Sequence, residues 1–293
     1  MSPEASETDP ANGLVVVDKP GGITSHDVVA RVRRLAGTRK VGHAGTLDPM
    51  ATGVLVLGVG RATRLLGHLL VTDKAYEATV RLGESTSTDD AEGETVARTP
   101  ADSVTEADVR AALARLVGDV DQVPSTVSAI KVDGKRAYAR VRSGEQVELA
   151  PRRVRIDGIE VHAVRGTDVD ISVSCSSGTY VRAIARDLGA ALGVGGHLVL
   201  LRRTAVGPYR LDDARTLEAL ADDFAVLPIA DAARAAFPSL VLDEASATDV
   251  RFGRKLTLRL PAAGPVALFA GDGEFLALYE QTGELARAVA VFV

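Results

Sequence analysis

The chain lacks tryptophan and has one cysteine among its 293 residues, and only 4% of its residues are aromatic. The single Cys175 excludes an internal disulfide and cannot by itself form a cysteine-based zinc site. With 46% hydrophobic residues and few aromatics, the core must consist mainly of Val, Leu, Ile and Ala. No apolar run approaches the roughly 18 residues of a membrane-spanning helix, and the polar, acidic first ten residues are unlike a secretory signal. We therefore expect a soluble, cytoplasmic protein whose Cys175 is inert core.

Charge is distributed unevenly along the chain, although the formal net charge is only −5. Residues 12–74 carry nine basic and four acidic side chains, residues 75–122 carry four and eleven, and residues 123–165 carry nine and five. Two basic blocks separated by an acidic block form one basic surface if the fold brings them together, and such a surface attracts a phosphate backbone. The competing interpretation is that these side chains solvate helix faces.

Apolar periodicity predicts the order of helices and strands. Strands are expected at residues 13–18, 54–59, 75–82, 128–132, 154–161, 169–175 and 197–206, and helices at 24–36, 65–70, 105–116, 178–192 and 217–227. Residues 83–103 are polar and are expected to form an exposed loop. Without a regular alternation of strand and helix, this order favours an α+β fold with a mixed, mostly antiparallel sheet flanked by helices.

Three segments are expected along the chain. Residues 1–11 form a disordered acidic N-terminus, residues 12–235 form the main domain, and residues 236–293 form a small β-rich C-terminal domain with strands near 240–242, 266–270, 275–279 and 288–293. Gly-rich turns between these short strands support the last assignment.

Several familiar chemical motifs are incomplete. Residues 58–63 lack the third glycine of a dinucleotide-binding loop, no Walker lysine follows a glycine run, and the five histidines lack metal-ligand spacing. These absences argue against a dinucleotide-binding loop, a Walker-type phosphate loop and a zinc site. A hydrolase built on His43 and Asp48 stays an alternative, although a G-x-S-x-G elbow is missing.

The densest run of conformationally special residues is 40–53, KVGHAGTLDPMATG. Glycines permit a left-handed backbone and close approach, and Pro49 keeps Asp48 out of helical geometry. The run predicts a rigid loop that presents the Asp48 carboxylate at the mouth of a cleft. An Asp that merely caps a turn is the competing interpretation.

Six blocks of the sequence resemble the TruB family of tRNA pseudouridine synthases. They are KPGGITS at 19–25, GHAGTLDPMATG at 42–53, DKAY at 73–76, VPSTVSAIK at 123–131, GTYVRA at 178–183 and LRRTAVG at 201–207. The blocks occur in family order and cover roughly residues 12–211. The chain departs from many relatives at Val127, where they carry a tyrosine.

The resemblance implies a cofactor-free isomerase that converts uridine-55 in the T loop of tRNA to pseudouridine after flipping the base. It implies a catalytic domain with the pseudouridine synthase fold, a PUA-like C-terminal domain, and a monomer that acts on the tRNA T arm without an obligatory protein partner. Asp48 matches the essential catalytic aspartate, and Arg182 matches the cation that keeps a buried carboxylate ionised.

The remaining site residues are also carried over from the family motifs. Tyr76 is expected to stack on the flipped uracil and Tyr180 to line the pocket, although both positions also suit core tyrosines. His43 is expected to fill the space that the flipped uridine leaves. Basic residues that bind phosphate or brace the pocket are Lys19, Lys131, Arg202 and Arg203.

Two further alternatives come from within RNA biology. One is a non-catalytic tRNA-binding or tRNA-folding protein with the same fold, and the presence of Asp48, Tyr76 and Arg182 argues against it. The other is a relative guided by small RNAs, and the short chain without long Lys-rich tails argues against that.

Overall fold

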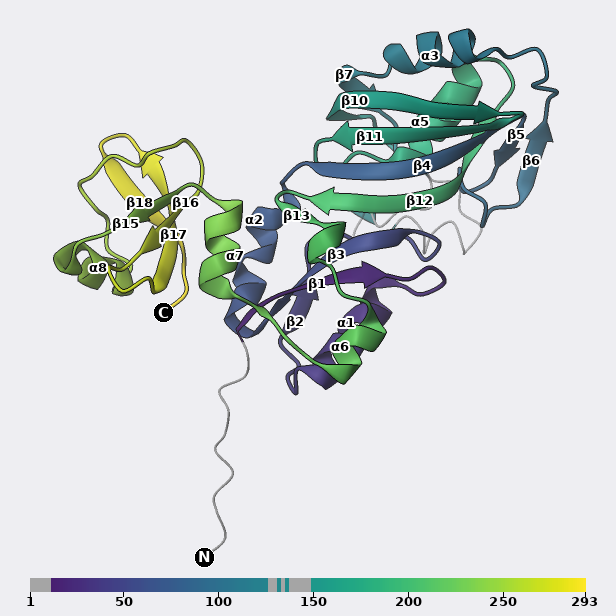
Figure 1. The fold of residues 1–293 in the computed structure, drawn as a ribbon. Helices are drawn as coiled ribbons and strands as arrows, with labels where there is room; N and C mark the ends of the chain where they lie inside the picture. Colours follow the sequence, from purple (N-terminus) through teal and green to yellow (C-terminus); the bar gives the residue numbers. More distant parts are fainter. Residues whose placement is uncertain (1–11, 126–130, 133–134, 137–148) are drawn as a thin grey trace, which may run out of the picture. The chain divides into compact units, whose positions relative to one another are not determined.

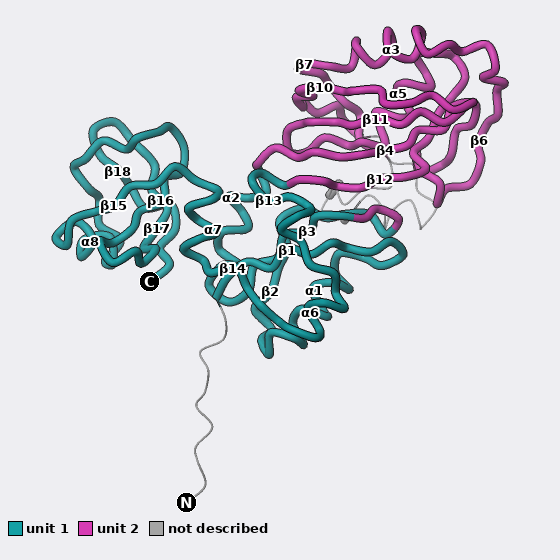
Figure 2. Tube along the Cα trace, viewed as in Figure 1, with its two compact units in different colours: residues 1–49, 53–71, 206–293 teal, residues 50–52, 72–205 magenta. Residues whose placement is uncertain are grey.

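A computed structural model describes residues 12–125, 131–132, 135–136 and 149–293. The chain forms two compact units, shown in different colours in Figure 2. Unit 1 comprises the described part of Met1–Pro49 together with Gly53–Val71 and Val206–Val293, and unit 2 comprises Met50–Thr52 and the described part of Thr72–Ala205. The predicted boundary between residues 235 and 236 does not coincide with this division and stays a prediction.

Unit 1 contains a small antiparallel sheet in which the strand order is β14 (Leu227–Pro228), β1 (Gly13–Lys19) and β3 (Thr52–Val59), with β2 (Val41–His43) also paired to β3. Strands β1 and β3 are apolar along nearly their whole length and buried on both faces, as their uninterrupted Val and Leu runs predict. Helix α1 (Ser25–Leu35) contacts β2, and α6 (Leu217–Asp222) contacts β1 and α1.

Five short elements contribute further to the core of unit 1. These are η1 (Gly60–Arg64), α2 (Leu66–Leu70), β13 (Tyr209–Arg210), η2 (Leu211–Asp213) and α7 (Ile229–Ala236). One buried cluster joins Leu14 of β1, Val56 of β3 and Leu69 of α2 with Ala233 of α7 and Phe269 near the C-terminus. The C-terminal segment of unit 1, which follows α7, is therefore packed onto the same core as β1 and β3.

The C-terminal segment is a four-stranded sheet with one helix, as Figure 1 shows. Its strands follow the order β15 (Ser239–Val241), β16 (Val266–Phe269), β17 (Phe275–Thr282) and β18 (Leu285–Val291), and the first pair is parallel while the others are antiparallel. The predicted β-rich C-terminus is confirmed. Helix α8 (Glu244–Arg251) was not predicted; the Asp243 side chain caps it by accepting a 2.7 Å hydrogen bond from the Ser246 N–H.

Unit 2 is built on a sheet with the order β12 (Gly196–Val206), β4 (Lys74–Leu82), β11 (Asp168–Cys175), β10 (Arg152–Arg165) and β7 (Gly118–Gln122). Strands β4, β11, β10 and β7 pair antiparallel. Helix α5 (Val181–Ala191) packs on β4, and α3 (Glu106–Ala114) contacts α5 and β10 (Figure 1). The short ladders are β5 (Glu84–Thr86) with β6 (Thr95–Arg98) and β8 (Lys131–Val132) with β9 (Lys135–Arg136).

The mixed α+β class with a mostly antiparallel sheet is confirmed, but three local predictions were wrong. Residues 83–103 are not a plain exposed loop, because they form the β5–β6 hairpin and bury Asp90, which is 3% exposed. The expected helix at 217–227 ends at Asp222, because Asp223 is extended and Leu227 pairs with Leu14 of β1.

The expected helix at 178–192 begins only at Val181. Gly178 has a φ of +89° and Tyr180 is extended, so the chain turns before the helix starts. Of the strand expected at 128–132, residues 128–130 lie outside the described residues. Among the described residues, no helix combines the length and apolarity needed to cross a membrane.

Candidate active site

Asp48 lies in unit 1, in the loop between β2 and β3, and the residue before it is fixed by a buried serine. The Leu47 N–H donates to Ser25 Oγ over 2.8 Å, and the Ser25 hydroxyl donates back to the Leu47 carbonyl oxygen over 2.9 Å. Ser25 is 1% exposed and is the first residue of α1. The backbone next to the predicted catalytic carboxylate is therefore tied to the start of a helix.

The residue after Asp48 is held by Lys19, which is fully buried at the end of β1. Its ammonium donates to the carbonyl oxygens of Pro20, at 2.8 Å, and Pro49, at 3.1 Å. The Gly22 N–H also donates to the Pro49 carbonyl over 2.8 Å, in a turn whose φ of +82° suits glycine. Of the two predicted roles for Lys19, phosphate contact and bracing, these bonds support bracing, and charge-assisted bonds are strong ones.

His43 lies half-buried on β2, and its ring meets the ring of His26, on the first turn of α1, edge to face. The ring centroids are 5.6 Å apart and the planes form an angle of 86°. Farther along α1, an Arg33 guanidinium N–H donates to the Val41 carbonyl over 3.0 Å. Both the first and the last turn of α1 therefore support the segment that carries His43. His26 was not predicted, because nothing in its spacing links it to position 43.

In unit 2, Arg182 lies in the first turn of α5 and forms a buried ion pair with Asp90. Its Nη1 atom is 3.3 Å from Asp90 Oδ2 and donates to the Thr88 carbonyl over 3.0 Å, and the two side chains are 5% and 4% exposed. Asp90 Oδ1 also accepts hydrogen bonds from the Thr88 hydroxyl and, at 3.1 Å, from the Glu92 N–H. The ion pair fixes the guanidinium and attaches the segment around Asp90 to the start of α5.

Asp90 is a residue that the sequence analysis missed. It occurs among many Asp, Glu, Ser and Thr residues that indicated an exposed loop, so no local signal separates it from solvated carboxylates. The predicted pairing of Arg182 with Asp48 joins residues of different units and stays a prediction.

Tyr180 precedes α5, and its backbone is held by a buried amide. Gln122, 5% exposed at the end of β7, accepts from the Tyr180 N–H over 2.8 Å and donates to the Tyr180 carbonyl over 3.1 Å. Helix α5 has no side-chain N-cap, so these two bonds are what fixes the backbone of Tyr180, the residue that precedes the helix. Gln122 was also missed by the sequence analysis; it fixes the backbone from which the Tyr180 ring projects.

Tyr76 lies on β4 and is 7% exposed, on the same face of the strand as the buried Lys74. Burial, and then the charge of Arg203, lower the pKa of Lys74 to about 8. Cys175 pairs with Lys74 across the sheet, so the predicted burial of this cysteine is confirmed, and burial raises the pKa of its thiol to about 11. Arg203 is 1% exposed. Tyr76 thus lies on the strand face that also carries the buried Lys74, whose charge is influenced by the buried Arg203.

The last two predicted basic residues are also in unit 2. An Arg202 guanidinium N–H donates to the Thr52 hydroxyl over 3.3 Å, and Thr52 belongs to the short segment Met50–Thr52 of that unit. Lys131 lies on β8, and residues 126–130 of the same sequence block lie outside the described residues.

The structure thus places the predicted residues in two sets. Unit 1 contains Lys19, His43 and Asp48, and unit 2 contains Tyr76, Lys131, Tyr180, Arg182 and Arg202. Within the described ranges, no group of three or more His, Cys, Asp or Glu side chains could hold a metal ion.

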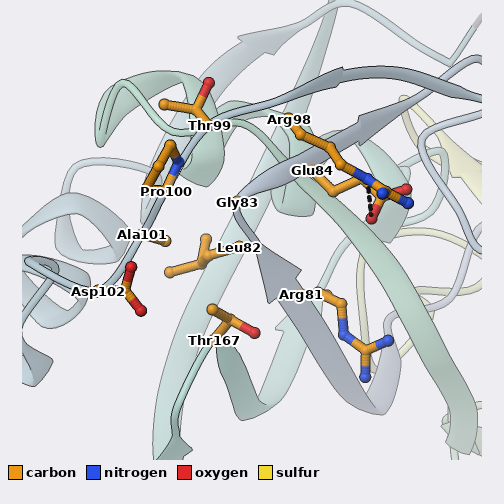
Figure 3. Close-up of a pocket in the computed structure, with 10 residues that line it drawn as sticks. All are labelled: Arg81, Leu82, Gly83, Glu84, Arg98, Thr99, Pro100, Ala101, Asp102 and Thr167. Carbon is orange, nitrogen blue, oxygen red and sulfur yellow. Dashed lines mark ion pairs between the residues drawn. The ribbon is translucent and has the colours of Figure 1, made fainter.

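A pocket of about 350 Å³ in unit 2 is separate from these residues (Figure 3). It lies where β4 ends and β5 begins, and the ion pair between Arg98 and Glu84 borders it, with 3.4 Å between Nε and Oε2. None of the described residues that line it was predicted as a site residue. Its lining combines this ion pair with the apolar Leu82, Pro100 and Ala101, and it gives no independent indication of a reaction.

Comparison with protein families matches most of the chain. The model described as TruB family pseudouridylate synthase (N terminal domain) matches residues 33–181. The tRNA pseudouridylate synthase B C-terminal domain matches residues 182–235, and the C-terminal model of tRNA pseudouridine synthase II matches residues 237–293.

Curated proteins and solved structures agree with these matches. The chain is 60% identical over 295 residues to tRNA pseudouridine synthase B of Arthrobacter sp. (strain FB24), covering 96% of each chain. It is 57% identical to the protein of the same name from Streptomyces griseus, covering 98% of this chain and 99% of the relative. The structure of a Cbf5-Nop10-Gar1 complex contains a similar chain, with a TM-score of 0.76, 27% identity and coverage of 96% of this chain and 85% of that one. The predicted fold, a pseudouridine synthase fold with a C-terminal β domain, is thereby confirmed.

Proposed function

The chain belongs to the TruB family of pseudouridylate synthases, and from that premise we propose that it isomerises uridine to pseudouridine in tRNA, at uridine-55 of the T loop. The identity to proteins named tRNA pseudouridine synthase B, maintained over nearly the full length, carries the enzymatic assignment. The proposed target nucleotide and the proposed roles of individual residues go beyond those names.

The reaction needs no redox partner. The bond between ribose C1′ and uracil N1 breaks, the base turns, a bond from C1′ to C5 forms, and the proton that leaves C5 is replaced by one gained at N1. Asp48 is the proposed catalytic residue, and three routes stay open for it: attack on the sugar, attack on the base, or removal of a ribose proton. Each route needs an ionised carboxylate in a fixed position.

The loop around Asp48 supports this role through its fixed geometry. Ser25 holds Leu47 on one side, and Lys19 holds Pro49 on the other. A carboxylate whose two backbone neighbours are anchored loses little conformational entropy when the substrate arrives, which is what efficient positioning requires. This double anchoring is the structural observation that best supports Asp48 as the catalytic group.

Residues of unit 2 are proposed to bind the extruded base and to control charge. Tyr76 stacks on the uracil, which is worth about 1–3 kcal/mol for a base on an aromatic ring. The guanidinium of Arg182, held in place by Asp90, supplies the positive charge that keeps a desolvated carboxylate ionised. Tyr180 lines the pocket from the start of α5, and Arg202 and Lys131 contact phosphate or brace the pocket.

His43 is proposed to occupy the space that the flipped uridine leaves. Extrusion of a base costs a few kcal/mol, and a side chain that fills the gap offsets part of that cost. tRNA is accordingly the proposed partner, recognised through the folded shape of its T arm. We further propose that the protein acts as a monomer in the cytoplasm.

The decisive experiment compares the wild-type protein with Asp48→Asn on an unmodified tRNA transcript. Pseudouridine is mapped by a chemical adduct that stops reverse transcription, and tRNA affinity is measured separately. We expect isomerisation to be lost in the variant while the Kd for tRNA changes less than about threefold, because the amide has the same shape as the carboxylate. A transcript with cytidine at position 55 is the control for the target nucleotide.

Two results would contradict the proposal. Normal pseudouridine formation by Asp48→Asn would refute the role of Asp48. Tight tRNA binding by a wild-type protein that modifies no nucleotide would favour the non-catalytic alternative.

A further inference from the structure

The ring of His26, in the first turn of α1, packs against the ring of His43 at the end of β2. The centroids are 5.6 Å apart, and the 86° angle between the planes is the edge-to-face arrangement that aromatic rings prefer. His26 is exposed and His43 is half-buried. One ring therefore remains at the surface while its partner reaches toward the interior.

The backbone that carries His26 is fixed by a complete capping box. The Thr24 hydroxyl oxygen accepts from the Asp27 N–H over 3.1 Å, and the Thr24 N–H donates to the Asp27 carboxylate over 2.9 Å. Hydrogen bonds from Thr24 lower the pKa of Asp27, so the carboxylate that completes this cap stays ionised. The capping box therefore fixes the backbone of His26 within α1 itself.

The same helical turn is also bonded to the loop that follows β2. Ser25, the neighbour of His26, holds Leu47 through two hydrogen bonds, and Leu47 is four residues beyond His43. The first turn of α1 thus contacts the loop after β2 by hydrogen bonds, next to Asp48, and contacts the end of β2 by ring packing, at His43. The hydrogen bonds fix the backbone, and the ring contact restricts the plane of the His43 ring.

We propose that His26 is a positioning residue for His43, holding its ring in the orientation in which it enters the space of the flipped uridine. This inference rests on the proposed function, because it assumes that His43 acts on the extruded base's former site. His26 touches no reacting atom in this proposal. Its effect on the reaction passes entirely through the His43 ring.

The proposal predicts a particular pattern in a double-mutant cycle. We expect His26→Ala to lower kcat/KM for pseudouridine formation roughly threefold to tenfold, as expected for the loss of one aromatic pair. In a His43→Ala background, His26→Ala should cause no further loss, because there is no ring left to orient. His26→Phe keeps a ring in the same place and should restore kcat/KM to within about twofold of the wild type.

The experiment measures single-turnover pseudouridine formation, with tRNA limiting and the enzyme at sub-saturating and saturating concentrations, for the wild type and the four variants. Base extrusion is followed separately with 2-aminopurine placed beside the target uridine, and thermal unfolding checks that α1 stays folded. The loss in His26→Ala should appear in extrusion and in the rate of pseudouridine formation, with the Kd for the initial tRNA complex nearly unchanged.

The outcomes separate this inference from the proposed function. Additive losses in the double variant, or a His26→Phe protein as impaired as His26→Ala, would overturn the inference in an enzyme that is otherwise active; the latter would indicate that the His26 nitrogens contact the RNA directly. A wild-type protein that forms no pseudouridine would overturn the proposed function, and this inference with it.

Discussion

Replacing Asp90 with asparagine removes the negative charge from a pair of side chains that are each at most 5% exposed. Asp90 Oδ2 lies 3.3 Å from Arg182 Nη1, so the substitution leaves a buried guanidinium facing a neutral amide. Removal of one partner of a buried ion pair typically costs about 3–5 kcal/mol. Because Arg182 keeps its 3.0 Å bond to the Thr88 carbonyl, we expect a loss of about 2–4 kcal/mol in the free energy of unfolding.

Asp89→Asn is a matched control on the neighbouring residue. Asp89 pairs with Arg186 at 3.2 Å, but these side chains are 17% and 31% exposed, and such pairs contribute about 1 kcal/mol or less. Asp89 has a φ of +61°, which asparagine also tolerates, so the control adds no backbone strain.

The assay is urea denaturation of both variants beside the wild type, followed by pseudouridine formation under native conditions. Asp90→Asn should unfold at clearly lower urea than Asp89→Asn and should form pseudouridine more slowly, since the guanidinium is no longer fixed. Equal urea midpoints for the two variants would refute the argument that the loss in the free energy of unfolding depends on how deeply the ion pair is buried.

Three further predictions follow from single contacts. Between pH 8 and 10.5, Lys74 is protonated in the unfolded chain and deprotonated in the folded protein. The free energy of unfolding should therefore rise with pH across this range. The contribution of Lys74 to this rise is about 3 kcal/mol at most, and about 1–2 kcal/mol after solvent screening. Urea titrations across this range should show that rise in the wild type relative to Lys74→Met, and parallel profiles would contradict the burial of a charged Lys74. Ser25→Ala leaves two buried backbone groups of Leu47 unbonded, so the free energy of unfolding should fall by about 1–3 kcal/mol in denaturation experiments; an unchanged value would mean that the loop relaxes freely. Arg39→Gln, at an exposed position in the basic block 12–74 that is expected to attract the phosphate backbone, should reduce the slope of log K for tRNA against log salt by about one, and an unchanged slope would place Arg39 away from the RNA.

Local patterns in the sequence were sufficient for most of the regular elements. The uninterrupted apolar run Leu14–Val17 and the alternation of β4 agree with the strands predicted there, and the helices predicted at 24–36 and 105–116 begin where Thr24 and Thr105 form capping boxes. These predictions succeeded because each depends on residues only a few positions apart. Helix α7 and strand β14 were missed, because β14 has only two residues, ends at Pro228 directly before α7, and like α7 contacts β1, far away in the sequence.

The sequence by itself determined the family, the mostly antiparallel α+β class and the glycine-rich loop that presents Asp48, since these depend on short blocks of fixed spacing. Only the tertiary structure decided which polar residues bond to the predicted site residues and fix their positions. Arg182 bonds to the Thr88 carbonyl from 94 positions away, and Gln122 holds Tyr180 across 58 positions. A carboxylate or an amide looks the same in sequence whether it is solvated or buried; the difference arises only when folding removes water and brings a partner within hydrogen-bond distance.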